Sequence, residues 1–242
     1  MYELPYYVWA LVLAGAIGIP AATSAVLYRG AIAAGLGRRA ATTVTATTAV
    51  VLGGWLVLSG LLAGAGVYSL EPGDSVPWLL VVFTATLTAL LLATRIPLVS
   101  RILADPGMPA RLALPHTLRV VGVLFLIVMA QGHLPAVFAL PAGLGDIAIG
   151  VAAPFVARRL AHGTGRTGAV RFNVLGILDL IVAGIVGFLL LPSTAPLTLL
   201  PLALVPTAAV PVALALHIVS LRRLRSAARA EEGEAGHLPA AG

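Results

Sequence analysis

The chain has 242 residues, of which 60% are hydrophobic and only 10% are charged, and its mean hydropathy is +1.03. Soluble domains have roughly 45–50% apolar and about 25% charged residues, so this composition excludes an ordinary soluble fold and indicates a chain that lies in a bilayer. Cysteine and lysine are both absent, which excludes disulfides, thiol chemistry, a lysine Schiff base and a phosphate-binding Walker loop.

Apolar runs long enough to cross roughly 30 Å of hydrocarbon as helices follow one another along the chain. We place seven of them, at Tyr7–Leu27, Val44–Val67, Val76–Thr94, Leu118–Leu134, Ala136–Ala157, Phe172–Leu191 and Leu197–Leu221. We therefore predict an all-α polytopic membrane protein, with a bundle of seven transmembrane helices in residues 1–225 and no soluble domain. The small and polar residues 226–242 are predicted to form a disordered cytoplasmic tail.

The longest connection, Ile96–Pro115, alternates apolar residues with Arg101, Asp105 and Arg111 and contains several prolines. We expect it to lie along the inner membrane surface as a broken amphipathic segment.

All 15 basic residues are arginine, and they fall in the segments after the first, third, fifth and seventh runs. The opposite segments hold only Glu3, Glu71 and Asp74 among charged residues. Because cytoplasmic loops collect basic residues, the chain is predicted to cross a cell membrane several times, with its N-terminus outside and its C-terminus in the cytoplasm. In this pattern Arg119 counts as a residue at the cytoplasmic start of the fourth run.

The chain carries a net charge of +6, which could favour either nucleic acid or anionic lipid headgroups as a partner. The arginines are dispersed at helix ends without interleaved aromatic residues, so the expected partner is a bilayer with anionic headgroups and not nucleic acid.

Two aspartates lie inside apolar runs that are antiparallel neighbours. Asp146, in the stretch PAGLGDIAIG, lies about ten residues into the fifth run, and Asp179 about seven to nine residues into the sixth, so both are expected near the bilayer centre. A charge at that depth costs about 2.5–3.5 kcal/mol, so both should face the bundle interior. Two facing carboxyls would tend to share one proton, which suits a proton relay or a general acid and base. Alternatively, protonated carboxyls merely hold the helices together.

Glycines accompany both acids. Gly143 precedes Asp146 by three residues and Gly176 precedes Asp179 by three, so each lies on the same helical face as its acid. Together with Gly145 they are predicted to allow close helix packing.

Gly143-Leu-Gly-Asp146 resembles the Gly-x-Gly-Asp motif of intramembrane aspartyl proteases, such as presenilin-like enzymes and prepilin peptidases. The resemblance implies that Asp146 is the motif aspartate, and Asp179 could stand in for the second acid on a neighbouring helix. It covers four residues. In those families the motif aspartate comes second in the chain, whereas Asp146 comes first, and no clear Pro-Ala-Leu element follows.

His116 and His217 are expected at similar depths near the cytoplasmic ends of the fourth and seventh runs. Two imidazoles at equal depth could hold a haem, with nearby arginines meeting its propionates. Alternatively, each histidine is an interfacial residue that bonds water or headgroups. Arg171 and Asn173 begin the sixth run and, with Arg119, could help to receive an anionic group in an inner vestibule.

No motif identifies a substrate, and no metal site is expected. We expect a proton-linked transporter of a small solute or lipid, with Asp146 and Asp179 as the proton-relay pair. The alternatives are an aspartyl-protease-like or other membrane hydrolase and a haem-binding membrane redox protein. The expected substrate-binding residues are His116, Arg119, Arg171, Asn173 and His217.

Overall fold

The structure is a computed structural model that describes residues 4–69, 76–191 and 193–235, with side chains up to Arg229. Within these ranges the chain is helical and contains no strand. The elements, in order, are α1 (Tyr6–Ala33), α2 (Gly37–Gly64), α3 (Trp78–Ala93), α4 (Pro97–Leu103), α5 (Met108–Ala113), η1 (Leu114–Gly122), α6 (Val123–Ala130), α7 (Ala136–Ala161), α8 (Arg166–Leu189), η2 (Ala195–Thr198), η3 (Val205–Ala209) and α9 (Val210–Ala235).

The structure confirms an all-α chain with several helices that can cross a membrane. Among the residues that the structure describes, six segments are long and apolar enough, and the count rises to seven if the bent pair α3 and α4 is one span. The six are Tyr6–Ala33, Gly37–Gly64, Met108–Ala130, Ala136–Ala161, Arg166–Leu189 and Val205–Arg229.

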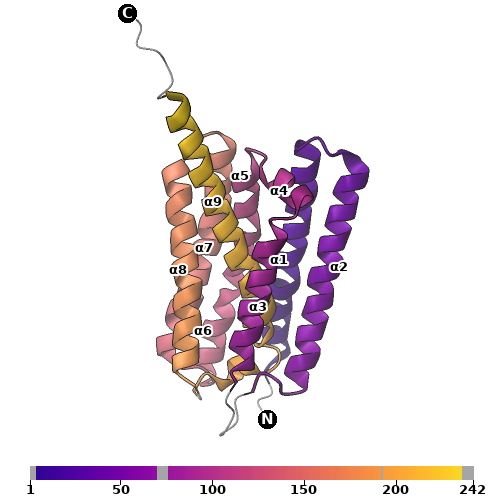
Figure 1. The fold of residues 1–242 in the computed structure, drawn as a ribbon. Coiled ribbons are helices and arrows are strands. Elements are labelled where there is room, and N and C mark those ends of the chain that lie inside the picture. The colour runs from indigo at the N-terminus through magenta and orange to yellow at the C-terminus, as the bar shows by residue number, and fades with distance from the viewer. Residues whose placement is uncertain (1–3, 70–75, 192, 236–242) are drawn as a thin grey trace, which may run out of the picture.

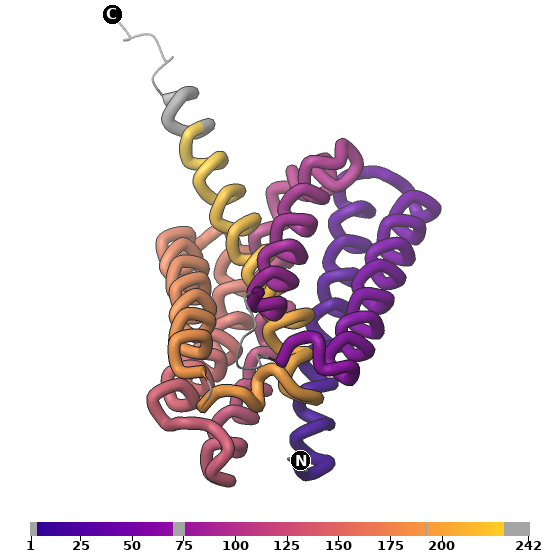
Figure 2. The backbone as a smooth tube through the Cα atoms, turned by 60° about the horizontal axis from the view of Figure 1, so that its bottom comes forward, coloured from indigo at the N-terminus to yellow at the C-terminus, as the bar shows by residue number. Residues whose placement is uncertain are grey.

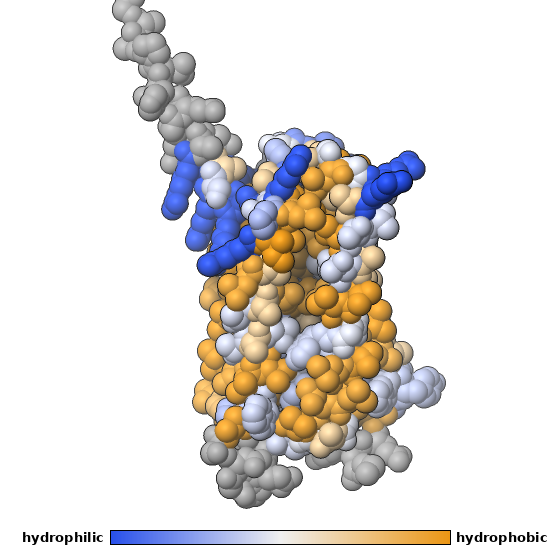
Figure 3. Space-filling view, turned by 45° about the vertical axis from the view of Figure 1, so that its right-hand side comes forward, coloured by the Kyte–Doolittle hydropathy of each residue, from blue (hydrophilic) through white to orange (hydrophobic). Residues whose placement is uncertain are grey.

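The long helices stand side by side and alternate in direction along the chain (Figure 1). Hydrophilic side chains gather at the end of the bundle where the C-terminus leaves, and apolar side chains cover its flank (Figure 3). The charged residues expected at the opposite end, Glu3, Glu71 and Asp74, lie outside the described residues.

The bundle is organised around α9. Of its membrane-length window 72% is buried, against 17% of that of α2, so α9 is central and α2 is peripheral. α9 packs against α3, α5 and α8, whereas α2 packs mainly against α1 (Figure 2). Side chains from α1, α6, α7 and the η2–η3 segment form one core cluster around Phe125 and Phe138.

The fourth span begins earlier than the predicted Leu118–Leu134, because the segment from Met108 to Ala130 forms one run through α5, η1 and α6. Arg119 therefore lies near the middle of this span and not at its cytoplasmic start. The prediction that every arginine lies at one membrane surface is wrong for this residue. It failed because Arg119 was grouped with the arginines at the cytoplasmic helix ends, whereas its partners lie on other helices, which the local sequence does not show.

The centre of this span, η1, is a 3₁₀ helix of nine residues. Such helices have three residues per turn, so residues three apart project from the same side. His116, Arg119 and Gly122 therefore form one row. Glycines on the neighbouring helices let η1 approach them closely: a Cβ on Gly15 of α1 would lie 2.9 Å from Val121, and one on Gly150 of α7 would lie 2.6 Å from a backbone nitrogen of η1.

The predicted surface segment Ile96–Pro115 is only partly separate from the bundle. The proline at position 97 disfavours a helical Ile96, which has ψ 127°, and the chain turns by 81° from α3 into α4. The later residues, from Met108, belong to the fourth span. The predicted amphipathic segment therefore shortens to α4 and its connection to α5.

The predicted disordered tail is helical as far as the structure describes it. α9 continues to Ala235, since residues 226–235 are rich in Ala and Glu, which extend an existing helix readily. The predicted tail residues 236–242 lie outside the described residues.

A π-helical turn, η3, leads into α9. The carbonyl of Thr207 lies four residues before Pro211, which has no N–H to offer it. Trp55 Nε1 of α2 donates a hydrogen bond to this carbonyl over 2.9 Å. This contact accounts for a tryptophan deep in an apolar helix, away from the interfacial zone that tryptophan usually prefers.

Candidate functional site: a buried arginine bound by two aspartates

Arg119 of η1 lies in the core, with 2% of its side chain exposed. Its Nε donates to Asp146 Oδ1 of α7 over 2.6 Å, and its Nη2 donates to Asp179 Oδ2 of α8. The third arm, Nη1, lies 3.1 Å from His217 Nε2 of α9. One guanidinium thus joins three helices to η1, and each contact uses a different nitrogen of its planar fork.

The two aspartates occupy similar depths, as predicted. Asp146 is ten residues from the start of α7 and Asp179 ten residues from the end of α8, which corresponds to about 15 Å along each helix from the same end of the bundle. The prediction that the pair shares a proton assumed that no positively charged side chain contacts the two carboxyls. The structure instead places the guanidinium of Arg119 in contact with both carboxyls, so one cation joins them.

Hydrogen bonds fix the state of His217. Arginine can only donate, so His217 Nε2 must be the acceptor and Nδ1 must carry the proton. That Nδ1–H donates to Asn173 Oδ1 over 3.0 Å, and Asn173 Nδ2 donates in turn to Ser220 Oγ and to the Ala169 carbonyl. His217 is therefore a neutral imidazole in a defined tautomer, and the polar chain continues from the cluster towards the C-terminal end of α9.

His116 stacks on His217, with ring centroids 3.7 Å apart and an interplanar angle of 15°. Phe172 contacts His116 edge-on, at 5.7 Å between centroids, and also lies against His217. Both nitrogens of His116 are buried, and neither has a hydrogen-bond partner among the described residues. A haem held between two histidines needs one nitrogen of each imidazole to point at the iron from opposite sides. These two rings face each other in direct contact, so the pair does not fit a haem between them.

Glycines make room for the cluster. A Cβ on Gly145 would overlap the Asp179 carboxylate, one on Gly176 would overlap the His217 imidazole, and one on Gly122 would overlap Asp146. At the remaining predicted position, Gly143, a Cβ would lie 2.9 Å from Leu126 and 3.1 Å from the Gly122 carbonyl. The three glycines predicted for helix packing therefore all lie at close contacts, and two of them receive polar side chains of the cluster.

The structure brings most of the predicted site residues together, but not all. Asp146, Asp179, His116, Arg119, Asn173 and His217 form one connected group. Arg171 is exposed, because two residues along an α-helix from Asn173 it projects from a different face. Arg171 therefore lies outside this group, and its expected place in an inner vestibule stays a prediction.

Sequence reasoning missed Gly122, Phe172 and Ser220. The spacing of His116, Arg119 and Gly122 was the one available signal for the row on η1. This spacing places the three residues on one face only if the helix there has three residues per turn.

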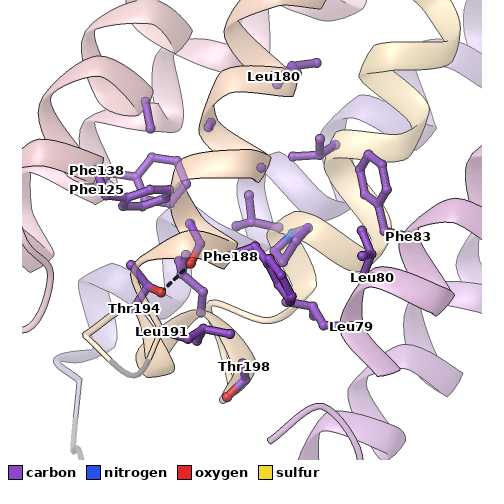
Figure 4. Close-up of a pocket in the computed structure, with 18 of the residues that line it drawn as sticks. Leu79, Leu80, Phe83, Phe125, Phe138, Leu180, Phe188, Leu191, Thr194 and Thr198 are labelled. Atoms are coloured by element: carbon purple, nitrogen blue, oxygen red, sulfur yellow. Dashed lines mark hydrogen bonds between the residues drawn. The ribbon is translucent and has the colours of Figure 1, made fainter. Parts of the chain in front are cut away.

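A cavity of about 160 Å³ opens beside the cluster. Asp146 and Asp179 line it, and the rest of its lining is almost entirely apolar. Figure 4 shows Phe125 and Phe138 on one side of this space and Phe83 on the other, with Phe188 between them. The helical part of the lining comes from α3, α6, α7, α8, η2, η3 and the start of α9.

The exposed fractions of the three charged groups differ at this cavity. The side chains of Asp146 and Asp179 retain 16% and 17% exposure, against 2% for Arg119. A group in the cavity therefore meets the carboxylates first, with the guanidinium behind them.

Tyr68, which follows the end of α2, also lines the cavity. Burial raises the pKa of its phenol, although a hydrogen bond with Ser59 acts in the opposite direction. Tyr68 is therefore neutral, and it adds no charge to the cavity.

The arrangement does not fit an aspartyl protease well. That chemistry needs two carboxyls that share a proton and hold a water between them. Here one oxygen of each carboxylate is bound by Arg119. The resemblance to the Gly-x-Gly-Asp motif is therefore limited to the sequence of these four residues. The charged groups around Asp146 do not resemble those of an aspartyl protease.

The fold and this site define an all-α protein with helices long and apolar enough to cross a membrane and with a charged cluster buried at its centre. The chain belongs to the family described as "Domain of unknown function (DUF8737)", whose model matches residues 76–225. The matched range contains the whole cluster, from His116 to Ser220, and excludes α1 and α2. No curated protein matches the chain, and no solved structure does.

Proposed function

We propose that this protein is a proton-linked transporter of a small solute or lipid, in which Asp146 and Asp179 exchange the coupling proton. The observation that carries the proposal is the charge of the cluster. With both aspartates ionised, the charges of Arg119, Asp146 and Asp179 are +1, −1 and −1, so the cluster carries one uncompensated negative charge.

An uncompensated charge in a low-dielectric interior is strongly unfavourable, so the cluster has a physical reason to take up one positive charge. A proton on either carboxyl neutralises it. The two carboxylates are accessible for proton uptake, because both line the cavity while Arg119 stays covered. Ionisable residues in the middle of membrane helices commonly mark proton relays and solute pathways.

The proposal includes a location. The arginines at one end of the bundle support an orientation with the C-terminus in the cytoplasm and the N-terminus outside, in a cell membrane. In that orientation the cavity lies in the outer half of the bundle, since it is lined by the end of α8 and by the η2–η3 segment.

Purified protein in liposomes that contain an internal pH dye tests this function. Solute gradients are imposed with three one-ring probes, which are benzyltrimethylammonium as cation, benzyl alcohol as neutral compound and benzenesulfonate as anion. We expect protein-dependent proton movement with at least one of them.

The double variant D146N/D179N should abolish that movement. The matched control is D105N, because Asp105 pairs with Arg111 at the α4–α5 connection, away from the cavity. Absence of proton movement with all three probes, or movement that persists in D146N/D179N, would overturn the proposal.

A further inference from the structure

We infer that the cavity binds a small organic cation with one ring-sized apolar group, and that this cation and a proton compete for the single negative charge of the cluster. The inference rests on the proposed function and specifies its substrate class and its mode of coupling, which is exchange of the cation against a proton.

The sign of the ligand's charge follows from which groups the cavity exposes. Asp146 and Asp179 line the cavity, and Arg119 is not among its lining residues. Each carboxylate uses one oxygen for Arg119. Among the described residues, the other oxygens, Asp146 Oδ2 and Asp179 Oδ1, have no hydrogen-bond donor. A ligand that enters the cavity therefore meets acceptor oxygens, which favour a cation over the anionic group expected from the sequence.

The other ionisable groups near the carboxylates do not change this sign. His217 is neutral because it accepts from Arg119. A positive charge on His116 would be buried without a partner, because both its ring nitrogens are buried and have no hydrogen bond among the described residues. The remaining polar ring at the cavity, Tyr68, is neutral as well. From η1, α7, α8 and α9 together, the charges at the cluster are thus those of Arg119, Asp146 and Asp179 alone.

The size and lining of the cavity indicate the size and apolar character of the uncharged part of the ligand. An apolar cavity of about 150 Å³ is known to hold a benzene molecule, and this one has a volume of about 160 Å³. Four phenylalanines line it: Phe83, Phe125, Phe138 and Phe188. Aromatic faces attract cations and also pack against apolar groups. A ring-sized apolar group with one positive charge therefore matches both the walls and the carboxylate end.

Competition follows from the charge count. One proton or one bound cation brings the cluster to zero, and both together would leave it at +1 in a buried site. The two states therefore exclude each other. In the exchange the carboxyl O–H bond breaks and the proton forms an O–H bond with a water molecule as the cation arrives, and no other covalent bond changes.

Calorimetric binding of benzyltrimethylammonium to the full chain in detergent tests this inference. Its charge is permanent, so any pH dependence comes from the protein. We expect binding that is at least tenfold tighter than that of benzyl alcohol or benzenesulfonate. Affinity should fall on acidification by up to tenfold per pH unit, since one proton competes for one charge.

The D179N variant should lose the preference for the cation, because it brings the cluster to zero charge, while D105N should bind as the wild type does. Equal binding of the neutral or anionic probe, unchanged cation binding in D179N, or cation affinity that is independent of pH in the wild type would each overturn the inference. The pH series on the wild type decides the question even if D179N fails to fold.

The two proposals can fail separately. Cation binding without proton movement in liposomes would overturn the transport function and leave the cation site standing. Proton movement driven by benzyl alcohol or benzenesulfonate, but not by benzyltrimethylammonium, would keep transport and overturn the cation inference.

Discussion

Arg119 is the residue on which the cluster depends, because among the described residues it is the one positive charge that both aspartates contact. Without it two carboxylates would face each other in a nearly dry interior, and His217 Nε2 would lose its donor. Burial of a charge without a partner is among the costliest changes a folded protein can suffer.

The R119Q variant is therefore predicted to lower the free energy of unfolding by about 3–5 kcal/mol, the usual cost of breaking a buried ion pair. Most of that loss should return in the triple variant R119Q/D146N/D179N, which removes the stranded charges as well. Thermal unfolding in one detergent, followed by circular dichroism, measures both.

R158Q is the control for that experiment, because Arg158 is an exposed arginine in the last turn of α7 and its change should stay within about 0.5 kcal/mol. If the triple variant is no more stable than R119Q alone, Arg119 acts through its packing and not through its charge.

At the scale of single elements, two irregular segments position the cluster. The 3₁₀ geometry of η1 aligns His116 with Arg119, and the π-helical turn η3 brings α9 into the bundle with Pro211 in its first turn. Both depend on contacts with regular helices. Glycines of α1 and α7 admit η1, and Trp55 of α2 satisfies a carbonyl that Pro211 leaves without its helical donor.

The Trp55 contact predicts a non-additive pair of substitutions. W55F leaves the Thr207 carbonyl without its donor and should cost about 1–3 kcal/mol, the penalty for an unsatisfied buried acceptor. In the P211A background the backbone N–H of residue 211 can donate instead, so W55F should cost much less there. A double-mutant cycle on unfolding free energies measures the difference.

W78F is the matched control for the tryptophan, since Trp78 is half exposed at the start of α3. Equal costs of W55F in the wild-type and P211A backgrounds would show that the indole stabilises the bundle through apolar contact alone.

For the whole molecule, the sequence was sufficient for the fold class and insufficient for the arrangement of charge. Apolar runs are local, so most spans were found near their true positions. Asp146, Asp179 and the glycines beside them were identified because a charge or a close approach inside an apolar helix is visible locally.

The position of Arg119 was not recoverable in the same way. Its span was cut short because the residue was read as interfacial, and the stabilising partners come from α7, α8 and α9, which lie 27 to 98 residues away in the chain. Pairing between distant helices decides whether a charge can be buried, and a single sequence does not display that pairing.

The orientation of the whole bundle is the last prediction, and the absence of cysteine makes it directly measurable. Single cysteines replace Gln131, between α6 and α7, and Thr164, between α7 and α8, which lie at opposite ends of α7. If basic residues face the cytoplasm, a membrane-impermeant maleimide should label Q131C on intact cells and label T164C only after the membrane is opened. Cysteine-free wild-type protein gives the background. Labelling of T164C on intact cells, with Q131C protected, would invert the bundle and place the cavity and its carboxylates in the cytoplasmic half.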